Sequence, residues 1–159
     1  MQEKGLDLIY GYKLSEKDMI NIFFNKEFKE YVLDMCKSDK ELPKIKKMFD
    51  ANNKTKNINY RIIGLFCDYH SECFFGEDGD ESNIAVYCTK CCMYDKESNW
   101  IIGIQICHLP ALKNEIKMID TYTISGHDEN ELKRIKHKLN LMVTDCAFYS
   151  VPSDCWCCT

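Results

Sequence analysis

Hydrophobic positions in the first third of the chain predict one strand followed by two helices. Apolar residues alternate along Leu6–Leu14, which is typical of a strand. Residues 15–18 form a capping-box pattern, and so do residues 38–41. The first box precedes apolar positions at spacings of four and three, which predict one continuous buried helix: Ile20, Phe24, Phe28, Val32 and Met35. The second precedes the apolar positions of a short amphipathic helix: Leu42, Ile45, Met48 and Phe49.

A polar loop at residues 50–59 separates this region from a run of predicted strands. The loop is rich in Asn and Lys and is the candidate internal boundary of the chain. Four strand-like runs follow it: Ile58–Phe66, Ile84–Tyr94, Trp100–Leu109 and Glu115–Ile124. The second and third flank a polar segment, residues 95–99, that predicts a hairpin loop.

The C-terminal part predicts one more helix and one more strand. Residues 125–128 form a third capping-box pattern before apolar positions at helical spacing: Leu132, Ile135, Leu139 and Met142. Asp145–Val151 predicts a last strand, ended by Pro152. The order predicts a single α+β domain over residues 1–159, with an antiparallel sheet of about four to six strands and two or three helices packed on one face. Strict alternation of strands and helices is missing, which argues against a doubly wound parallel sheet.

Composition places the chain among folded proteins. It has 159 residues, of which 45% are hydrophobic and 29% charged. No apolar run approaches the roughly 20 residues that span a bilayer. The first residues lack the apolar stretch of a secretory signal, so we expect an intracellular, cytoplasmic protein in a reducing compartment.

The charge pattern argues against nucleic acid as a partner. The net charge is −4, and only Arg61 and Arg134 are arginines, the residue that specific DNA recognition favours. One basic cluster contains Lys44, Lys46, Lys47, Lys54 and Lys56. It is compatible with contact to nucleic acid or a membrane surface, but the solvated face of a short helix is the simpler interpretation.

The cysteines suggest a metal site. There are eleven, ten of them after residue 59. Cys67, His70 and Cys73 lie at spacings of three, and Cys88 and Cys91 form a C-x-x-C pair further on. Structural zinc favours four Cys or His ligands in two such groups, so the candidate ligands are Cys67, either His70 or Cys73, Cys88 and Cys91.

Two other interpretations of these cysteines stay open. Neighbours three apart in a strand point to opposite faces, so zinc binding by Cys88 and Cys91 requires a bulge or a break at residues 89–90. Packed or incidental thiols avoid this requirement and are the preferred interpretation. A thiol–disulfide enzyme using Cys88 and Cys91 would need a helix after the first cysteine, where the sequence predicts strand and turn.

The tail carries a second thiol cluster. Cys155, Cys157 and Cys158 surround Trp156. Three thiols here could bind metal, join another chain or lie in an apolar groove, and a terminal segment docked on the sheet is the favoured interpretation.

Residues 8–18 and the cysteine-rich end resemble uncharacterised proteins of large DNA viruses of the mimivirus kind. The Lys-, Asn- and Ile-rich composition is typical of an AT-rich genome. The resemblance covers about a tenth of the chain and transfers no functional residue. It implies a virus-encoded accessory or virion protein, which would place it in the host cytoplasm or the virion.

The sequence contains none of the common catalytic motifs, such as a nucleophile elbow, a phosphate-binding loop or a zinc-protease helix. Aromatic residues make up 12% of the chain, many of them in predicted strands. The first hypothesis is therefore a non-enzymatic module acting through contact with a protein partner or by self-association, with no cofactor. A zinc-stabilised domain is the alternative, and a thiol enzyme comes third.

Overall fold

The computed structural model describes residues 5–50, 58–74, 83–88, 100–109 and 124–152. Within them the elements follow one another in this order: β1 (Leu6–Lys13), α1 (Glu16–Phe23), α2 (Lys26–Met35), α3 (Leu42–Asp50), α4 (Tyr60–Tyr69), α5 (Ser71–Phe74), β2 (Ile84–Cys88), β3 (Trp100–Leu109), α6 (Gly126–Lys138) and β4 (Ala147–Pro152). The four strands form one antiparallel sheet in the order β2-β3-β1-β4. The predicted α+β class with an antiparallel sheet is confirmed. The described residues contain six helices, where the sequence predicted two or three.

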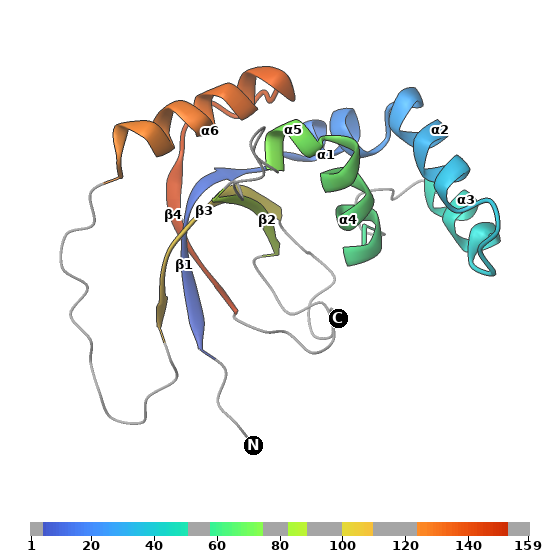
Figure 1. Ribbon diagram of the computed structural model, residues 1–159, viewed down its shortest axis with the longest axis horizontal. Coiled ribbons are helices and arrows are strands. Elements are labelled where there is room, and N and C mark those ends of the chain that lie inside the picture. The colour runs from blue at the N-terminus through green and yellow to red at the C-terminus, as the bar shows by residue number, and fades with distance from the viewer. Residues whose placement is uncertain (1–4, 51–57, 75–82, 89–99, 110–123, 153–159) are drawn as a thin grey trace.

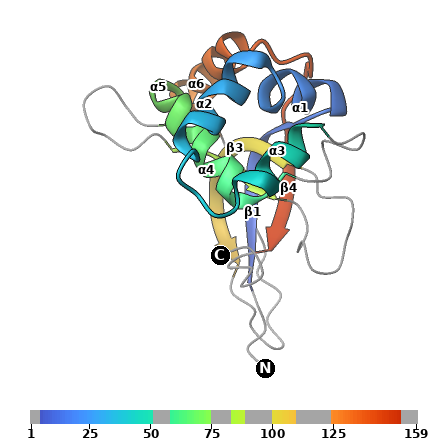
Figure 2. The same ribbon diagram turned by 90° about the vertical axis from the view of Figure 1, so that its right-hand side faces the viewer.

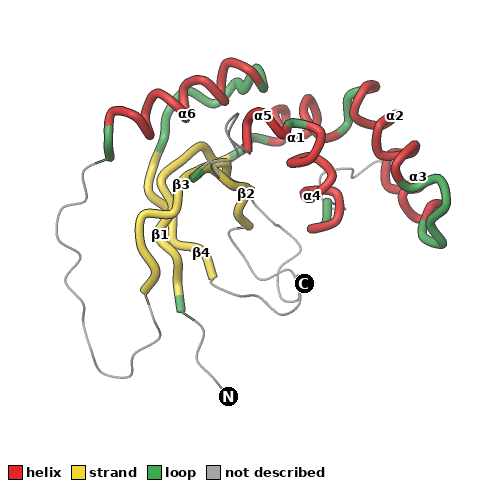
Figure 3. Tube along the Cα trace, viewed as in Figure 1, coloured by secondary structure: helices red, strands yellow, loops and turns green. Residues whose placement is uncertain are grey.

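Helices and sheet form two layers. Figures 1 and 2 show α6 lying across one end of the sheet and α1 to α5 grouped beside it. Figure 3 shows the same division, with the strands on one side and the helices along the other. One large apolar core joins the helices to one face of the sheet. The strands contribute these side chains to it: Tyr12, Ile84, Trp100, Ile102 and Ile104. This core contains residues from both sides of the 50–59 loop, while the single domain over residues 1–159 stays a prediction.

Two of the three capping motifs act as the sequence predicts. Ser15 caps α1 and accepts a hydrogen bond from the backbone N–H of Asp18, and Ser125 does the same for α6 with Asp128. In the motif at residues 38–41, the acceptor is Asp39 and not the predicted Ser38: Asp39 accepts from the backbone N–H of Glu41, just before α3. These bonds satisfy N–H groups that a helix start leaves without intrahelical acceptors.

The predicted continuous helix after residue 15 is wrong. It is divided at residues 24–25, where Asn25 caps α2 by accepting from the backbone N–H of Phe28. Phe28 is buried, but Ile20 and Met35 at the two ends of the predicted stripe are exposed. The division lets the two short helices bury different faces in one core.

The predicted strand Ile58–Phe66 is also wrong, because α4 occupies most of that range. Asn59 caps α4 through the backbone N–H of Ile62. The β-branched isoleucines favoured a strand, but Ile62, Ile63 and Phe66 are buried at helical spacing. Tertiary packing therefore overrides local preference here.

The other predicted elements are confirmed where the structure describes them. β2 and β3 pair as the hairpin prediction requires, and β4 falls within one or two residues of its predicted range. α6 buries Leu132 and Ile135, but Met142 lies beyond its end and is exposed. The predicted strand at Glu115–Ile124 and the loop at 95–99 lie outside the described residues.

The sheet is curled around a second, smaller apolar cluster. The edge strands β2 and β4 approach each other although two strands lie between them. Ile9, Ile101 and Val151 form the cluster, with Tyr87 and Tyr149 packed against it. Its members come from all four strands and from no helix. The face opposite the helices is therefore also apolar.

A register shift between β1 and β3 adds a polar cluster to the end of this second face. Leu8 pairs with Cys107 but Ile9 pairs with Gln105, so Ile106 is an extra residue on β3. Beyond this bulge, the side chains of β3 alternate between the two faces of the sheet in the opposite order. Gln105 and His108 consequently both reach Asp7, with His108 Nδ1 2.6 Å and Gln105 Nε2 3.4 Å from its Oδ1. These contacts connect β1 to β3 beyond the backbone ladder.

Candidate functional site

The candidate zinc ligands are distributed over helix and strand. Cys67 lies in α4, His70 is its C-cap and Cys73 lies in α5. Cys88 ends β2, and Cys91 lies outside the described residues. Cys73 and Cys88 are both buried in the main core. Within the described parts of the chain, no three Cys, His, Asp or Glu residues are grouped in a way that could hold a metal ion.

Burial governs the ionisation of this group. Burial, with a smaller contribution from Asp68, raises the pKa of the Cys67 thiol to about 11. Burial also raises the pKa of Cys73 and lowers the pKa of His70. The thiolate is the form that binds metal or attacks a disulfide, so these environments favour packed, protonated thiols. The zinc site and the thiol–disulfide enzyme both stay predictions, because both depend on Cys91.

We expect protein purified without chelator to show the metal-free mass in a native mass spectrum. The physical reason is that Cys73 and Cys88 pack in the apolar core and that a thiol with a raised pKa is a poor ligand at neutral pH. One zinc per chain, lost together with the folded charge states on chelation and absent from a Cys67→Ser variant, would instead establish the zinc hypothesis.

The tail thiols Cys155, Cys157 and Cys158 lie outside the described residues. The proposed docking of the tail on the sheet stays a prediction. Lys54 and Lys56 of the basic cluster lie outside them as well.

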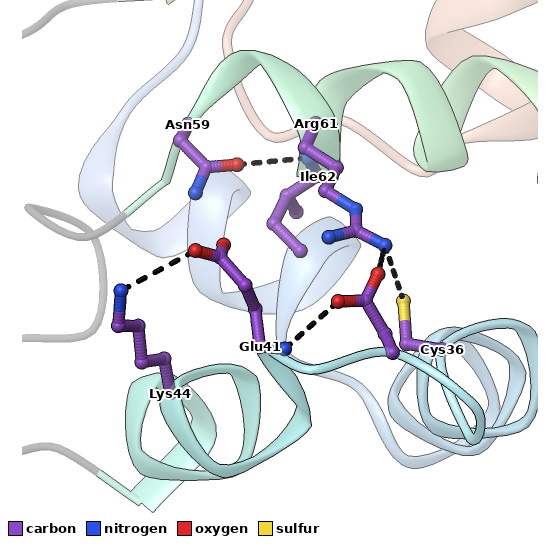
Figure 4. Close-up of polar contacts among 7 residues, drawn as sticks. Cys36, Glu41, Lys44, Asn59, Arg61 and Ile62 are labelled. Carbon is purple, nitrogen blue, oxygen red and sulfur yellow. Dashed lines mark hydrogen bonds and ion pairs between the residues drawn. The ribbon is translucent and has the colours of Figure 1, made fainter.

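Two lysines of the basic cluster, Lys44 and Lys47, line a pocket between α3 and the start of α4. The pocket has a volume of about 360 Å³. Its lining combines charged and apolar side chains from the two helices and the residues that precede them: Glu41, Lys44, Ile45, Lys47, Met48, Asn59, Arg61 and Ile62. Figure 4 shows Lys44 and Glu41 on the α3 side and Arg61 and Asn59 on the α4 side.

Ion pairs position the basic side chains around this pocket. Arg61 Nη2 pairs with Asp39 and lies 3.7 Å from Cys36 Sγ, so Arg61 connects α4 to the turn before α3 (Figure 4). Lys44 Nζ lies 3.3 Å from Glu41 Oε1. Exposed pairs of this kind contribute little stability, but they bias the side chains toward defined positions.

The sequence identified Lys44 and Lys47 but missed Arg61, Asn59 and Glu41. Arg61 and Asn59 belong to the start of α4, which the sequence predicted as a strand. The one available signal was Asn59 three residues before Ile62, a helix-capping spacing. The pocket itself exists only when α3 and α4 pack together.

A second exposed surface lies on β1 and β4, on the same face of the sheet as the helices. Phe148 and Leu6 are large apolar side chains that are 49% and 44% exposed. Phe148 pairs with Tyr10 across the strands, with ring centroids 4.9 Å apart. Figures 1 and 2 both show the free ends of β1, β3 and β4 extending beyond the helices. We refer to Leu6, Tyr10 and Phe148 as the apolar sheet surface.

The described residues thus define an α+β protein with a four-stranded antiparallel sheet, a basic pocket and an apolar sheet surface. Comparison of the chain with protein-family models, with curated proteins and with solved structures found no match. None of the helices that the structure describes is long and apolar enough to cross a membrane.

Proposed function

We propose that this protein is a non-enzymatic module that acts through protein–protein contact, and that the first partner of its apolar sheet surface is a second copy of the same chain. The observation that carries the proposal is the character of β4. It pairs with β1 on one side and, within the described sheet, with no other strand. It is therefore an edge strand.

β4 contains no charged residue that would protect this edge from pairing with another strand. Edge strands of monomeric proteins are usually guarded by lysines, other charges or bulges, because their unpaired backbone groups can recruit another strand. β4 has the sequence AFYSVP, with a proline only at its end. Ala147, Phe148 and Ser150 are exposed, while Val151 is buried. The segment available for pairing is therefore residues 147–150.

A second copy fits this edge by symmetry. Two identical strands can pair antiparallel about a two-fold axis, and the resulting interface uses the same residues from both partners. A charged strand would repel its own copy in that arrangement, whereas β4 would not. Phe148 would meet its symmetry mate beside Tyr10, which removes apolar surface from water. Since the available segment is short, we expect a dimer that dissociates on dilution.

We expect the unmodified protein to sediment as a concentration-dependent dimer and Phe148→Glu to sediment as a monomer. The glutamate would place two like charges together at the two-fold axis. Met35→Glu is the matched control, because Met35 is 56% exposed on α2, away from the sheet. It should leave the dimer intact.

Sedimentation velocity over a wide concentration range measures both variants, with circular dichroism to verify their fold. A monomeric unmodified protein at the highest concentration would contradict self-association. A dimer that survives Phe148→Glu would contradict the sheet surface as its interface.

The resemblance to viral proteins suggests an accessory or virion role, and that role and the cytoplasmic location stay predictions.

A further inference from the structure

The pocket between α3 and α4 has the size and construction of a small-ligand site. Pockets for small molecules have volumes of about 300 to 1,000 Å³, and this one has about 360 Å³. Such sites combine an apolar lining with a few polar groups that set the orientation of the ligand. Both components are present in the lining of this pocket.

The apolar part of the lining comes from both helices. Ile45 and Met48 project from α3, and Ile62 projects from the first turn of α4. All three belong to the main core and are buried. They are therefore held in place by packing and form a preformed apolar floor.

The charged part of the lining has an excess of cations. Lys44, Lys47 and Arg61 line the pocket with one carboxylate, Glu41, and the carboxylate of Asp39, outside the lining, pairs with Arg61. Glu41 pairs with Lys44, whereas Lys47 has no ion pair among the described residues. All these groups are exposed, so an anion can reach them from solvent.

Arg61 retains donors for a ligand. Asp39 and Cys36 both contact its Nη2 atom. The described residues place no partner on Nη1 or Nε, and a guanidinium has five N–H donors. Asp39 therefore holds Arg61 in position at the pocket without using all its hydrogen-bonding capacity.

The start of α4 adds to the positive electrostatic potential of the pocket. Its first turn contains no acidic residue, and Asn59 already caps it. The positive end of the helix dipole therefore reinforces the cations, which are the principal attraction for an anion.

We propose that this pocket binds a small phosphate monoester with an apolar or aromatic body. The lining carries three cations and one carboxylate, and a phosphate monoester carries a charge of roughly −1.5 to −2 at neutral pH. The apolar body would rest on Ile45, Met48 and Ile62. This site is separate from β4 and does not depend on the proposed self-association.

Four probes separate the contributions of the head group and the body: phenyl phosphate, inorganic phosphate, benzoate and benzyl alcohol. We expect phenyl phosphate to shift the backbone amide resonances of residues 59–62 and of α3 in nuclear magnetic resonance titrations, and to bind more tightly than the other three. Binding should weaken as salt is added, since the cations are exposed.

Lys47→Gln and its neighbour Lys46→Gln form a matched pair of variants. Both lysines are exposed on α3, but only Lys47 lines the pocket. We expect Lys47→Gln to raise the Kd for phenyl phosphate about tenfold, the effect of losing one charge-assisted contact. Lys46→Gln should leave the Kd nearly unchanged.

Three results would overturn the proposal. No shift in this region with any anion would mean that the pocket is not a site. Equal weakening by the two variants would mean non-specific attraction to a basic surface. If inorganic phosphate bound as tightly as phenyl phosphate, the pocket would not recognise an apolar body. If benzoate bound as tightly as phenyl phosphate, the pocket would not require a phosphate head group.

Discussion

Replacement of Asp18 by alanine is expected to lower the free energy of unfolding by about 2–3 kcal/mol. Asp18 is the fully buried charged residue of the described core, at 0% exposure. Its carboxylate accepts hydrogen bonds from the backbone N–H groups of Met142 (2.6 Å) and Val143 (3.3 Å) and from the Ser15 hydroxyl (2.9 Å). Alanine would leave these partly buried donors without their acceptor, and each such loss costs about 1–3 kcal/mol.

Asp128 is the matched control for this substitution. It occupies the same place after Ser125 in α6 that Asp18 occupies after Ser15 in α1. Asp128 is only half-buried, and among the described hydrogen bonds its carboxylate accepts none from residues distant in the chain. Asp128→Ala should therefore cost less than about 1 kcal/mol. Urea unfolding followed by circular dichroism compares the two, and similar losses would show that the contact with residues 142–143 contributes little.

Replacement of Gly11 by alanine is expected to destabilise the protein by about 3 kcal/mol or to prevent folding. Gly11 and Gly103 lie directly opposite each other in β1 and β3. A Cβ on Gly11 would lie 2.2 Å from the backbone oxygen of Ile102 and 2.4 Å from the Cα of Gly103. Backbone atoms in the middle of a sheet cannot move aside, so the strands would have to separate.

Gly64→Ala should stabilise the protein, whereas Gly11→Ala should destabilise it. Gly64 is exposed within α4, and a Cβ there meets nothing within 4 Å. Alanine should stabilise the helix by up to about 1 kcal/mol, because glycine has the greater backbone entropy to lose on folding. Thermal and urea unfolding measure both variants. A stable Gly11→Ala protein would show that close approach of β1 and β3 is not required for the curled sheet.

The parts of the fold that the sequence predicts well are those with local causes. Ser15 and Ser125 identify two helix starts because a cap is satisfied within three residues. The alternation along β1 and the hairpin-like spacing of β2 and β3 follow from short-range pattern alone. These predictions did not require knowledge of what each element packs against.

The failures occurred where several elements compete for one core. Residues 58–66 contain isoleucines that suit a strand, but burial of Ile62 and Phe66 beside Phe23 and Phe28 favours a helix. The long predicted helix is divided at Asn25 for a similar reason, since α1 and α2 bury different faces. The same limitation concealed the pocket, because Arg61 pairs with Asp39 in the turn before α3 only when α4 is helical.

By itself, the sequence determined the α+β class, the starts of α1 and α6, the antiparallel pairing of β2 with β3 and the basic character of α3, because each depends on neighbours a few residues apart. The tertiary structure alone decided the strand order, the curl of the sheet, the contact of Asp18 with residues more than a hundred positions away and the meeting of α3 with α4. These features depend on which apolar faces fit together in one close-packed core, and that fit is a property of the whole chain rather than of any segment.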